Sequence, residues 1–196
     1  HVRGVDTIIH LTRCFDSEKI QNVNKNVDPI RDLEIIETEI LLSDLESLQK
    51  RLEKNNKKKV DLEQLKLLKI ADNYINTGKN LTNLKDEFDK KLLNQSGLLS
   101  IKPKIFVCNV DEDSLKNGNE YTNKFIEKYK DDNTLIVSAD IENQINEFEN
   151  EEKKNYMNMI GLKETGLNIL IKKGYEILEL ETYFTSGIEE SRAWTI

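Results

Sequence analysis

The sequence predicts an α/β fold in which a parallel sheet is interrupted by a long helical insertion. Three patterns support this prediction. A strand-like run at 5–15 is followed by long helical patterns, the apolar period changes to that of buried strands near Pro103, and strand and helix patterns then alternate. At 196 residues, the chain is long enough for one large domain or two small ones.

The first elements are a strand and an unusually long helix. VDTIIHLTRCF at 5–15 combines β-branched and aromatic residues over a strand length. Asp28 followed by Pro29 is a typical helix start, and a helix from there to about residue 54 would be roughly 40 Å long. Its leucines recur at steps of four, three and four, which predicts a seam of the coiled-coil kind. The seam comprises Leu41, Leu45, Leu48 and Leu52.

Two further helices complete the predicted insertion. The second, at 61–78, carries an apolar stripe and ends at Gly78, a C-cap candidate. The stripe comprises Leu62, Leu65, Leu68, Ala71 and Ile75. Two apolar seams joined by a short polar loop predict an antiparallel helical hairpin. A third helix is predicted over 81–95, ending near Ser96 and Gly97.

After Pro103 the pattern becomes that of a βαβ unit. KPKIFVCNV at 102–110 and TLIVSAD at 134–140 are continuous apolar runs separated by an amphipathic helix at 120–130. This order calls for a parallel sheet. The segments 141–148, 151–161 and 166–180 are predicted to be helical. The last segment, 181–196, offers two short strands around Ser186 and Gly187, where another β-rich domain could begin.

Composition excludes several classes of protein. The net charge of −7 gives no general attraction for nucleic acid, so we expect no DNA partner, and no apolar stretch approaches the length of a membrane span. Cys14 and Cys108 both lie in apolar runs, which favours buried, reduced thiols in a soluble cytoplasmic protein, although a redox pair stays open. Because the sequence opens with His1 rather than Met, we expect a fragment of a longer protein.

Two polar segments follow the predicted parallel strands. Asn109-Val110-Asp111-Glu112 follows one strand, and Ser138-Ala139-Asp140 ends the next. Open α/β sheets bind ligands at the carboxyl ends of their strands. An amide, a carboxylate and free backbone N–H groups can together contact the edge of a purine. Ordinary polar strand-to-helix turns have the same composition, so the residues alone leave both interpretations open.

Four segments resemble the YchF-type, Obg-like ATPases, a branch of the P-loop GTPase superfamily. They are DTIIHLTRCF, VDPIRDLEIIETEI, KPKIFVCNVDED and, most specifically, LETYFTSGIEESRAWTI. The resemblance runs in order from His1 to Ile196 and is loosest across the helical hairpin. It implies the C-terminal part of a P-loop G domain, interrupted by a helical, coiled-coil-like domain and ending where a TGS β-grasp domain begins. The implied boundaries are 1–15, 16–100, 101–180 and 181–196.

The resemblance also implies roles for the polar segments. GTPases of this superfamily usually carry Asn-Lys-x-Asp, whose Asp takes both guanine N–H donors, whereas here the lysine is absent and the acid, Glu112, is one methylene longer. A site built for paired donors loses discrimination when that geometry fails, and the family's departure implies ATP in preference to GTP. By this resemblance Asn109 and Val110 contact adenine, Glu112 belongs to the altered motif, and Ser138 and Ala139 form the second base-side loop.

The sequence contains no G-x-x-x-x-G-K-[ST] motif, and its eight glycines are scattered singly. In this superfamily that loop and the switch regions handle the phosphates, Mg²⁺ and the attacking water. The resemblance therefore places those residues before His1, and we expect the isolated fragment to be inactive.

The family is associated with ribosomes, and a basic cluster is predicted at the hairpin tip. Lys54, Lys57, Lys58 and Lys59 could contact ribosomal RNA, because phosphate contacts need only local positive charge, but a solvated loop has the same composition. A second hypothesis is a nucleotide-independent helical module that docks the ribosome or a protein partner.

Other candidate residues have simpler structural interpretations. His10 lies within a strand pattern, where a hydrogen-bonded core role is expected rather than catalysis or metal binding. The carboxylates Glu149, Glu151 and Glu152 are typical of a solvated helix start. Arg192 and Trp194 could serve either strand pairing or recognition.

Overall fold

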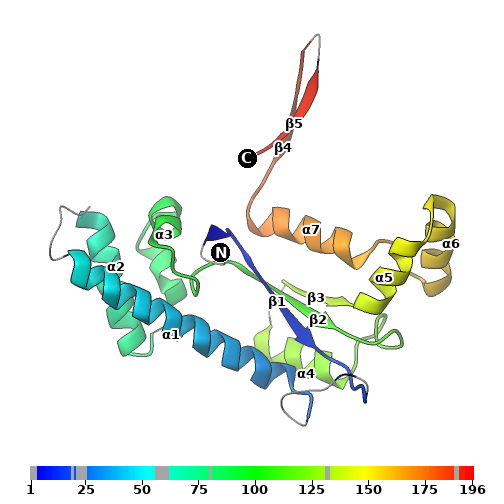
Figure 1. Ribbon diagram of the computed structural model, residues 1–196, viewed down its shortest axis with the longest axis horizontal. Helices are drawn as coiled ribbons and strands as arrows, with labels where there is room; N and C mark the ends of the chain where they lie inside the picture. Colours follow the sequence, from blue (N-terminus) through cyan, green and yellow to red (C-terminus); the bar gives the residue numbers. More distant parts are fainter. Residues whose placement is uncertain are drawn as a thin grey trace. The chain divides into compact units, whose positions relative to one another are not determined.

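A computed structural model describes residues 4–18, 20, 26–55, 62–79, 81–130, 133–187 and 190–196 (Figure 1). The chain divides into two compact units. The helical unit comprises His1–Ile8 and Arg31–Pro103, and the α/β unit comprises Ile9–Ile30 and Lys104–Ile196.

The elements follow the predicted order. The strands are β1 (Ile8–Arg13), β2 (Lys104–Asn109), β3 (Thr134–Val137), β4 (Thr182–Ser186) and β5 (Ser191–Thr195). The helices are α1 (Pro29–Asn55), α2 (Leu62–Asn76), the 3₁₀ helix η2 (Leu81–Asp86), α3 (Lys90–Ser96), α4 (Glu120–Tyr129), α5 (Ala139–Glu147), α6 (Asn150–Ile160) and α7 (Gly166–Ile177).

The α/β unit contains the predicted parallel sheet, with strand order β1-β2-β3. β2 and β3 pair in parallel, with Phe106 opposite Thr134 and Asn109 opposite Val137. Two hydrogen bonds show the direction of β1. Thr12 Oγ1 donates to the Val107 carbonyl, and two residues further along both strands the Cys14 N–H donates to the Asn109 carbonyl. β1 is therefore also parallel to β2, and the βαβ prediction is confirmed.

Helices cover both faces of this sheet. In Figure 1, α4 lies below the sheet and α7 above it. Phe106 of β2 packs edge-on against Phe125 of α4, with ring centroids 5.9 Å apart, and stacks on Tyr129 at 5.6 Å. Phe125 is fully buried, so α4 is held mainly by aromatic packing.

The last two predicted strands are present, and they pair as an antiparallel hairpin. Tyr183 of β4 is opposite Trp194 of β5, and every residue of both strands is exposed. The Trp194 Nε1–H donates to Thr185 Oγ1 at 2.8 Å, and Arg192 forms an ion pair with Glu190 at 2.9 Å. Arg192 and Trp194 thus both make contacts within this hairpin.

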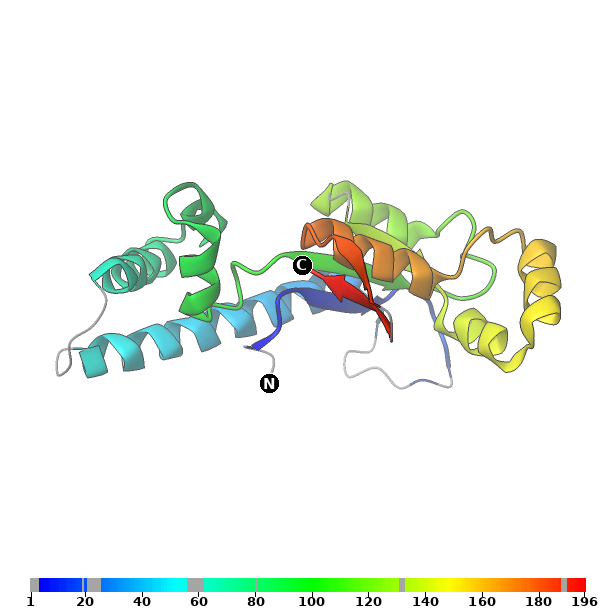
Figure 2. The same cartoon turned by 90° about the horizontal axis from the view of Figure 1, so that it is seen from above.

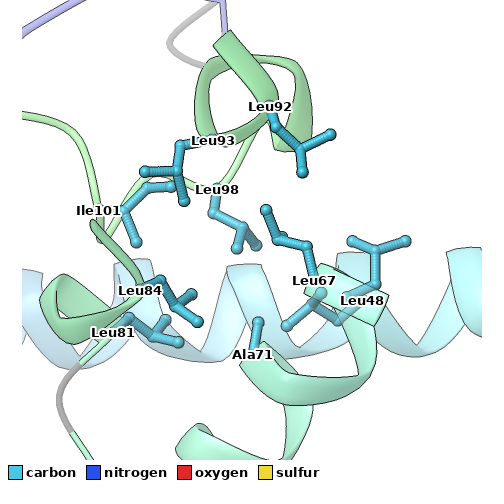
Figure 3. Close-up of a cluster of buried hydrophobic side chains, with 10 residues drawn as sticks. Leu48, Leu67, Ala71, Leu81, Leu84, Leu92, Leu93, Leu98 and Ile101 are labelled. Carbon is cyan, nitrogen blue, oxygen red and sulfur yellow. The ribbon is translucent and has the colours of Figure 1, made fainter. Parts of the chain in front are cut away.

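The helical unit has its own apolar core (Figure 3). Its buried members come from α1, α2, η2, α3 and the segment that follows α3. They are Leu48, Leu67, Leu68, Ala71, Leu81, Leu84, Leu92, Leu93, Leu98 and Ile101. At about 25 cal/mol per Å² of buried apolar surface, such a cluster is the main source of this unit's stability.

A buried carboxylate joins α1 to the end of this core. Asp44 is fully buried and accepts hydrogen bonds from the Leu99 N–H at 3.0 Å, the Ser100 N–H at 2.8 Å and the Ser100 hydroxyl at 2.6 Å. Arg51 of the same helix donates to the Ser96 carbonyl. These bonds attach the segment leaving α3 to one face of α1.

The structure corrects three details of the predicted insertion. The third helix is split into η2 and α3, because Asp89 caps a new helix by accepting from the Leu92 N–H at 2.7 Å. Of the predicted α1 seam, only Leu48 is buried, and Leu41 is 37% exposed. In α2 the predicted stripe is wrong at Leu62, which is 81% exposed.

The predicted end of α2 is confirmed. Gly78 has a φ of +70° and donates to the Ile75 carbonyl at 3.2 Å, while the Lys79 N–H donates to the Tyr74 carbonyl at 2.8 Å. This pair of bonds is the Schellman motif, which requires the left-handed backbone that glycine adopts at little cost.

Candidate functional site

The two polar segments meet at one edge of the parallel sheet. β2 ends at Asn109 and β3 at Val137, and these two residues are opposite each other in the register. The segments that begin at Val110 and Ser138 therefore leave the sheet side by side at its carboxyl edge, where open α/β sheets bind ligands.

Asn109 links the two segments directly. Its Oδ1 accepts a hydrogen bond from the Ala139 N–H at 3.0 Å, across 30 residues of sequence. Because a backbone N–H can only donate, this bond fixes which end of the amide is oxygen. The Nδ2 donor has no partner among the residues that the structure describes, so it remains able to donate to an acceptor such as a purine ring nitrogen.

Val110 and Glu112 lie in different surroundings. The Val110 side chain is buried at 2% exposure, and its N–H donates to the Val137 carbonyl at 2.9 Å. Only its carbonyl is left to face a ligand. Glu112 is exposed, and its carbonyl accepts from the Leu115 N–H at 3.2 Å within a turn.

Ser138 and Ala139 form the start of α5. Ser138 is the N-cap, but its hydroxyl does not cap the helix, is 1% exposed and has no hydrogen-bond partner among the described residues. A buried hydroxyl without a partner costs about 1 to 3 kcal/mol. The Ala139 N–H is already taken by Asn109, so it is not free to donate to a base.

The loop between β2 and α4 is fixed by side chains to which the sequence patterns assigned no such role. Asp111 Oδ1 accepts from the Ser114 N–H at 2.9 Å. Asn119 caps α4 by accepting from the Thr122 N–H at 3.1 Å, and its Nδ2 donates to the Cys14 carbonyl at 2.6 Å. The spacing from Asn119 to Thr122, just before an amphipathic run, is a sequence signal that could have revealed the cap. The bond to Cys14 left no such signal.

The two cysteines lie close together as buried, free thiols. Thr12 Oγ1 is 3.9 Å from the Sγ atoms of both Cys14 and Cys108. A side-chain hydrogen bond with Cys108, together with burial, raises the pKa of the Cys14 thiol. Both thiols are at 0% exposure, which supports the predicted core role.

The remaining candidates occupy structural positions. His10 is 7% exposed and stacks on Phe106 with ring centroids 5.6 Å apart. Glu151 and Glu152 lie in the first turn of α6, where carboxylates favour the helix dipole. Of the basic cluster, Lys57, Lys58 and Lys59 and the side chain of Lys54 lie outside the described residues.

The described part of the chain contains no group of three or more His, Cys, Asp or Glu side chains that could hold a metal ion. Within the same residues, no helix has both the length and the apolar character needed to cross a bilayer.

Comparison with known proteins identifies relatives along the whole chain. The chain is 37% identical over 207 aligned residues to the ribosome-binding ATPase YchF of Bacillus subtilis and 34% identical to that of Escherichia coli O157:H7. Each alignment covers 100% of this chain and 56% of the relative, so the chain spans little more than half the length of these relatives. No family model matches.

A solved structure agrees with these sequence relatives. The Schizosaccharomyces pombe YchF GTPase matches with a TM-score of 0.73 and 32% identity, covering 100% of this chain and 56% of that one. The α/β fold with its parallel sheet is thus shared with a YchF GTPase, which is consistent with part of a P-loop G domain. The resemblance seen in the four sequence segments is confirmed: along its whole length, the chain is homologous to the YchF-type proteins.

Proposed function

We propose that this chain supplies the base-recognition loops and the helical domain of an ATP-binding, ribosome-associated P-loop ATPase. The observation that carries the proposal is the hydrogen bond from the Ala139 N–H to Asn109 Oδ1. It holds the two polar segments together at the ligand-binding edge of the sheet and leaves the Nδ2 of Asn109 available to a purine. The names of the bacterial relatives, ribosome-binding ATPase, support this function.

In this proposal Asn109, Val110, Glu112, Ser138 and Ala139 line the base. Asn109 donates from Nδ2 to a ring nitrogen, and Val110 contributes its carbonyl. Ser138 contributes through its backbone, because its hydroxyl is buried at 1% exposure. Ala139 acts by orienting Asn109, and Glu112 replaces the shorter acid that takes the guanine donors in the wider superfamily.

The phosphate side of the reaction lies outside this sequence. We assign Mg²⁺, the triphosphate and the attacking water to the phosphate-binding loop and switch regions of the full-length protein. Hydrolysis would transfer the γ-phosphoryl group to water and switch the protein between ribosome-binding states. Since most nucleotide affinity comes from phosphate contacts, this chain alone should bind ATP only weakly. Because ribosomes are found in the cytoplasm, we place the full-length protein there.

Base preference is the sharpest test, because one relative is named an ATPase and the solved structure a GTPase. In the full-length protein we expect a lower Kd for ATP than for GTP by isothermal titration calorimetry. Glu112→Asp restores the shorter acid at an exposed position and should shift the ratio of the two Kd values toward GTP. An unchanged ratio would remove Glu112 from the site, and failure to bind either nucleotide would refute the proposal.

Ribosome association is tested separately. The variant Lys54→Ser, Lys57→Ser, Lys58→Ser and Lys59→Ser should co-sediment less with ribosomes, with the difference shrinking as salt increases. The matched control changes four exposed lysines of the α/β unit to serine, namely Lys116, Lys124, Lys128 and Lys163, which alters the net charge equally. Equal binding by both variants would rule out the basic cluster as a contact.

A second candidate function is supported by the division of the chain. The helical unit has its own core, so it could dock the ribosome or a protein partner without nucleotide. This function predicts that ribosome binding is the same with ATP, with ADP and without nucleotide, whereas the ATPase proposal predicts a difference.

A further inference from the structure

The turn from β3 into α5 is fixed from two sides. On the side of β2, the Val110 N–H donates to the Val137 carbonyl at 2.9 Å and Asn109 accepts from Ala139. These bonds fix the position of residues 137–139 at the edge of the sheet. They do not by themselves fix the orientation of α5 relative to β2, because both act on those three residues only.

Contacts with α7 supply the second side. The Glu142 carboxylate accepts from the Gly166 N–H at 2.6 Å and from the Leu167 N–H at 3.3 Å. These are the first two N–H groups of α7, which have no partner within their own helix, and a carboxylate there also favours the helix dipole. The Glu142 N–H donates to the Ser138 carbonyl at 3.0 Å. One residue thus joins the base-side turn to α7.

The start of α7 lies directly against the end of β3. A Cβ added to Gly166 would be 2.9 Å from Val137 Cγ1 and 3.1 Å from Glu142 Oε1. Figure 2 shows α7 running beside β3, with α5 continuing from the end of that strand. Glycine at position 166 therefore permits the close approach that brings its N–H within reach of Glu142.

We infer that Glu142 is a positioning residue for base recognition, an inference that rests on the proposed function. Both of its carboxylate oxygens are used by α7, so it acts through the turn and not on the nucleotide. If Glu142 is removed, α5 is no longer tied to α7, and Ser138 and Ala139 can shift relative to Asn109. A shift of about 1 Å in a contacting group is enough to weaken recognition greatly.

The test measures what the base adds to binding. In the full-length protein with Mg²⁺, Kd values for ATP and for inorganic tripolyphosphate are determined by calorimetry, and their ratio gives the contribution of the nucleoside. Glu142→Ala should lower this contribution about fivefold, in the range of effects seen for residues that act through others, with tripolyphosphate affinity unchanged. Glu142→Gln should recover part of the loss, because its amide oxygen can still accept from Gly166.

A matched control and a second variant separate positioning from folding. Glu147→Ala removes an exposed carboxylate from the same helix and should leave the ratio unchanged. Gly166→Ala disturbs the same contact from α7 and should also lower the nucleoside contribution without changing tripolyphosphate affinity. It therefore provides a second test if Glu142→Ala does not fold.

The outcomes distinguish this inference from the proposed function. If Asn109→Ala lowers the nucleoside contribution but Glu142→Ala and Gly166→Ala do not, the positioning role is overturned and the proposed function stands. An equal loss for ATP and tripolyphosphate would show a general structural role instead. If the unmodified protein binds ATP no better than tripolyphosphate, the proposed function itself fails.

Discussion

Among the described residues of the helical unit, ten buried side chains form the core, and eight of them are leucine. The strand-end loops of the α/β unit, by contrast, are held by individual hydrogen bonds: Asn109 to Ala139, Asn119 to Cys14 and Glu142 to Gly166. Leucine packing is non-directional, so it stabilises a unit without fixing any one atom closely. Hydrogen bonds contribute less free energy but fix direction. The comparison indicates that non-directional apolar packing holds the helical unit, whereas directional hydrogen bonds fix the strand-end loops of the α/β unit.

The largest expected effect comes from the leucine core. Leu67→Ala removes a fully buried side chain and should lower the free energy of unfolding by about 3 kcal/mol, measured by urea denaturation. Hydrogen exchange should increase across α2, η2 and α3 but not in β2 and β3. Increased exchange in the sheet as well would show that the two regions are not energetically separate.

Asp44 makes directional hydrogen bonds within the helical unit. Asp44→Ala leaves two backbone N–H groups and the Ser100 hydroxyl without their acceptor and should cost about 2 to 3 kcal/mol of unfolding free energy. Asp44→Asn keeps one oxygen and should cost less. The control is Glu53→Gln on the exposed side of the same helix, and losses equal to that control would mean that the buried bonds add nothing.

Asn109→Asp separates structure from recognition at the strand ends. The substituted carboxylate still accepts from the Ala139 N–H, so thermal stability should change little. The amide donor is lost, so ATP affinity of the full-length protein should fall about tenfold, or about 1.4 kcal/mol. A variant that melts much earlier yet binds ATP normally would reverse the assignment of roles.

Replacing one glycine in each region by alanine should have the smallest effect on stability and allows the two regions to be compared directly. Gly118 and Gly78 have φ values of +68° and +70°, so alanine at either position should cost about 1 kcal/mol in backbone strain. A Cβ at Gly118 would also lie 2.5 Å from Thr122 Oγ1, whereas nothing lies within 4 Å of one at Gly78. Gly118→Ala should therefore lower the melting temperature more than Gly78→Ala, and equal shifts would mean that Thr122 moves freely.

Much of the fold could be predicted because its signals are local. Strand runs, the start of α1 and the glycine that ends α2 depend on neighbouring residues only. The split between η2 and α3 was missed because Asp89, a helix-capping residue, lies within an otherwise helical pattern. The predicted apolar seams of α1 and α2 include residues that are exposed, such as Leu41 and Leu62. Periodicity shows which residues share a helix face but not how much of that face a partner covers.

The candidate site was predictable only in outline. Two polar segments after parallel strands had to meet at one edge, and the register places them there. The bond between Asn109 and Ala139 depends on the residue at which each strand ends and on the register between the strands, which the sequence does not give. Glu142 is 24 residues from Gly166, and Asn119 is 105 from Cys14, so no local pattern could link them.

The loop from β2 to α4 also has an evolutionary consequence. It is anchored at its start by Asp111 and Ser114, and near its end by Gly118 and Asn119. An insertion or deletion inside it would break one anchor and displace Asn109 or Cys14 from its partner. Related genes should therefore diverge here by exchanging residues at constant length, with Lys116 and Asn117, both exposed, changing most freely.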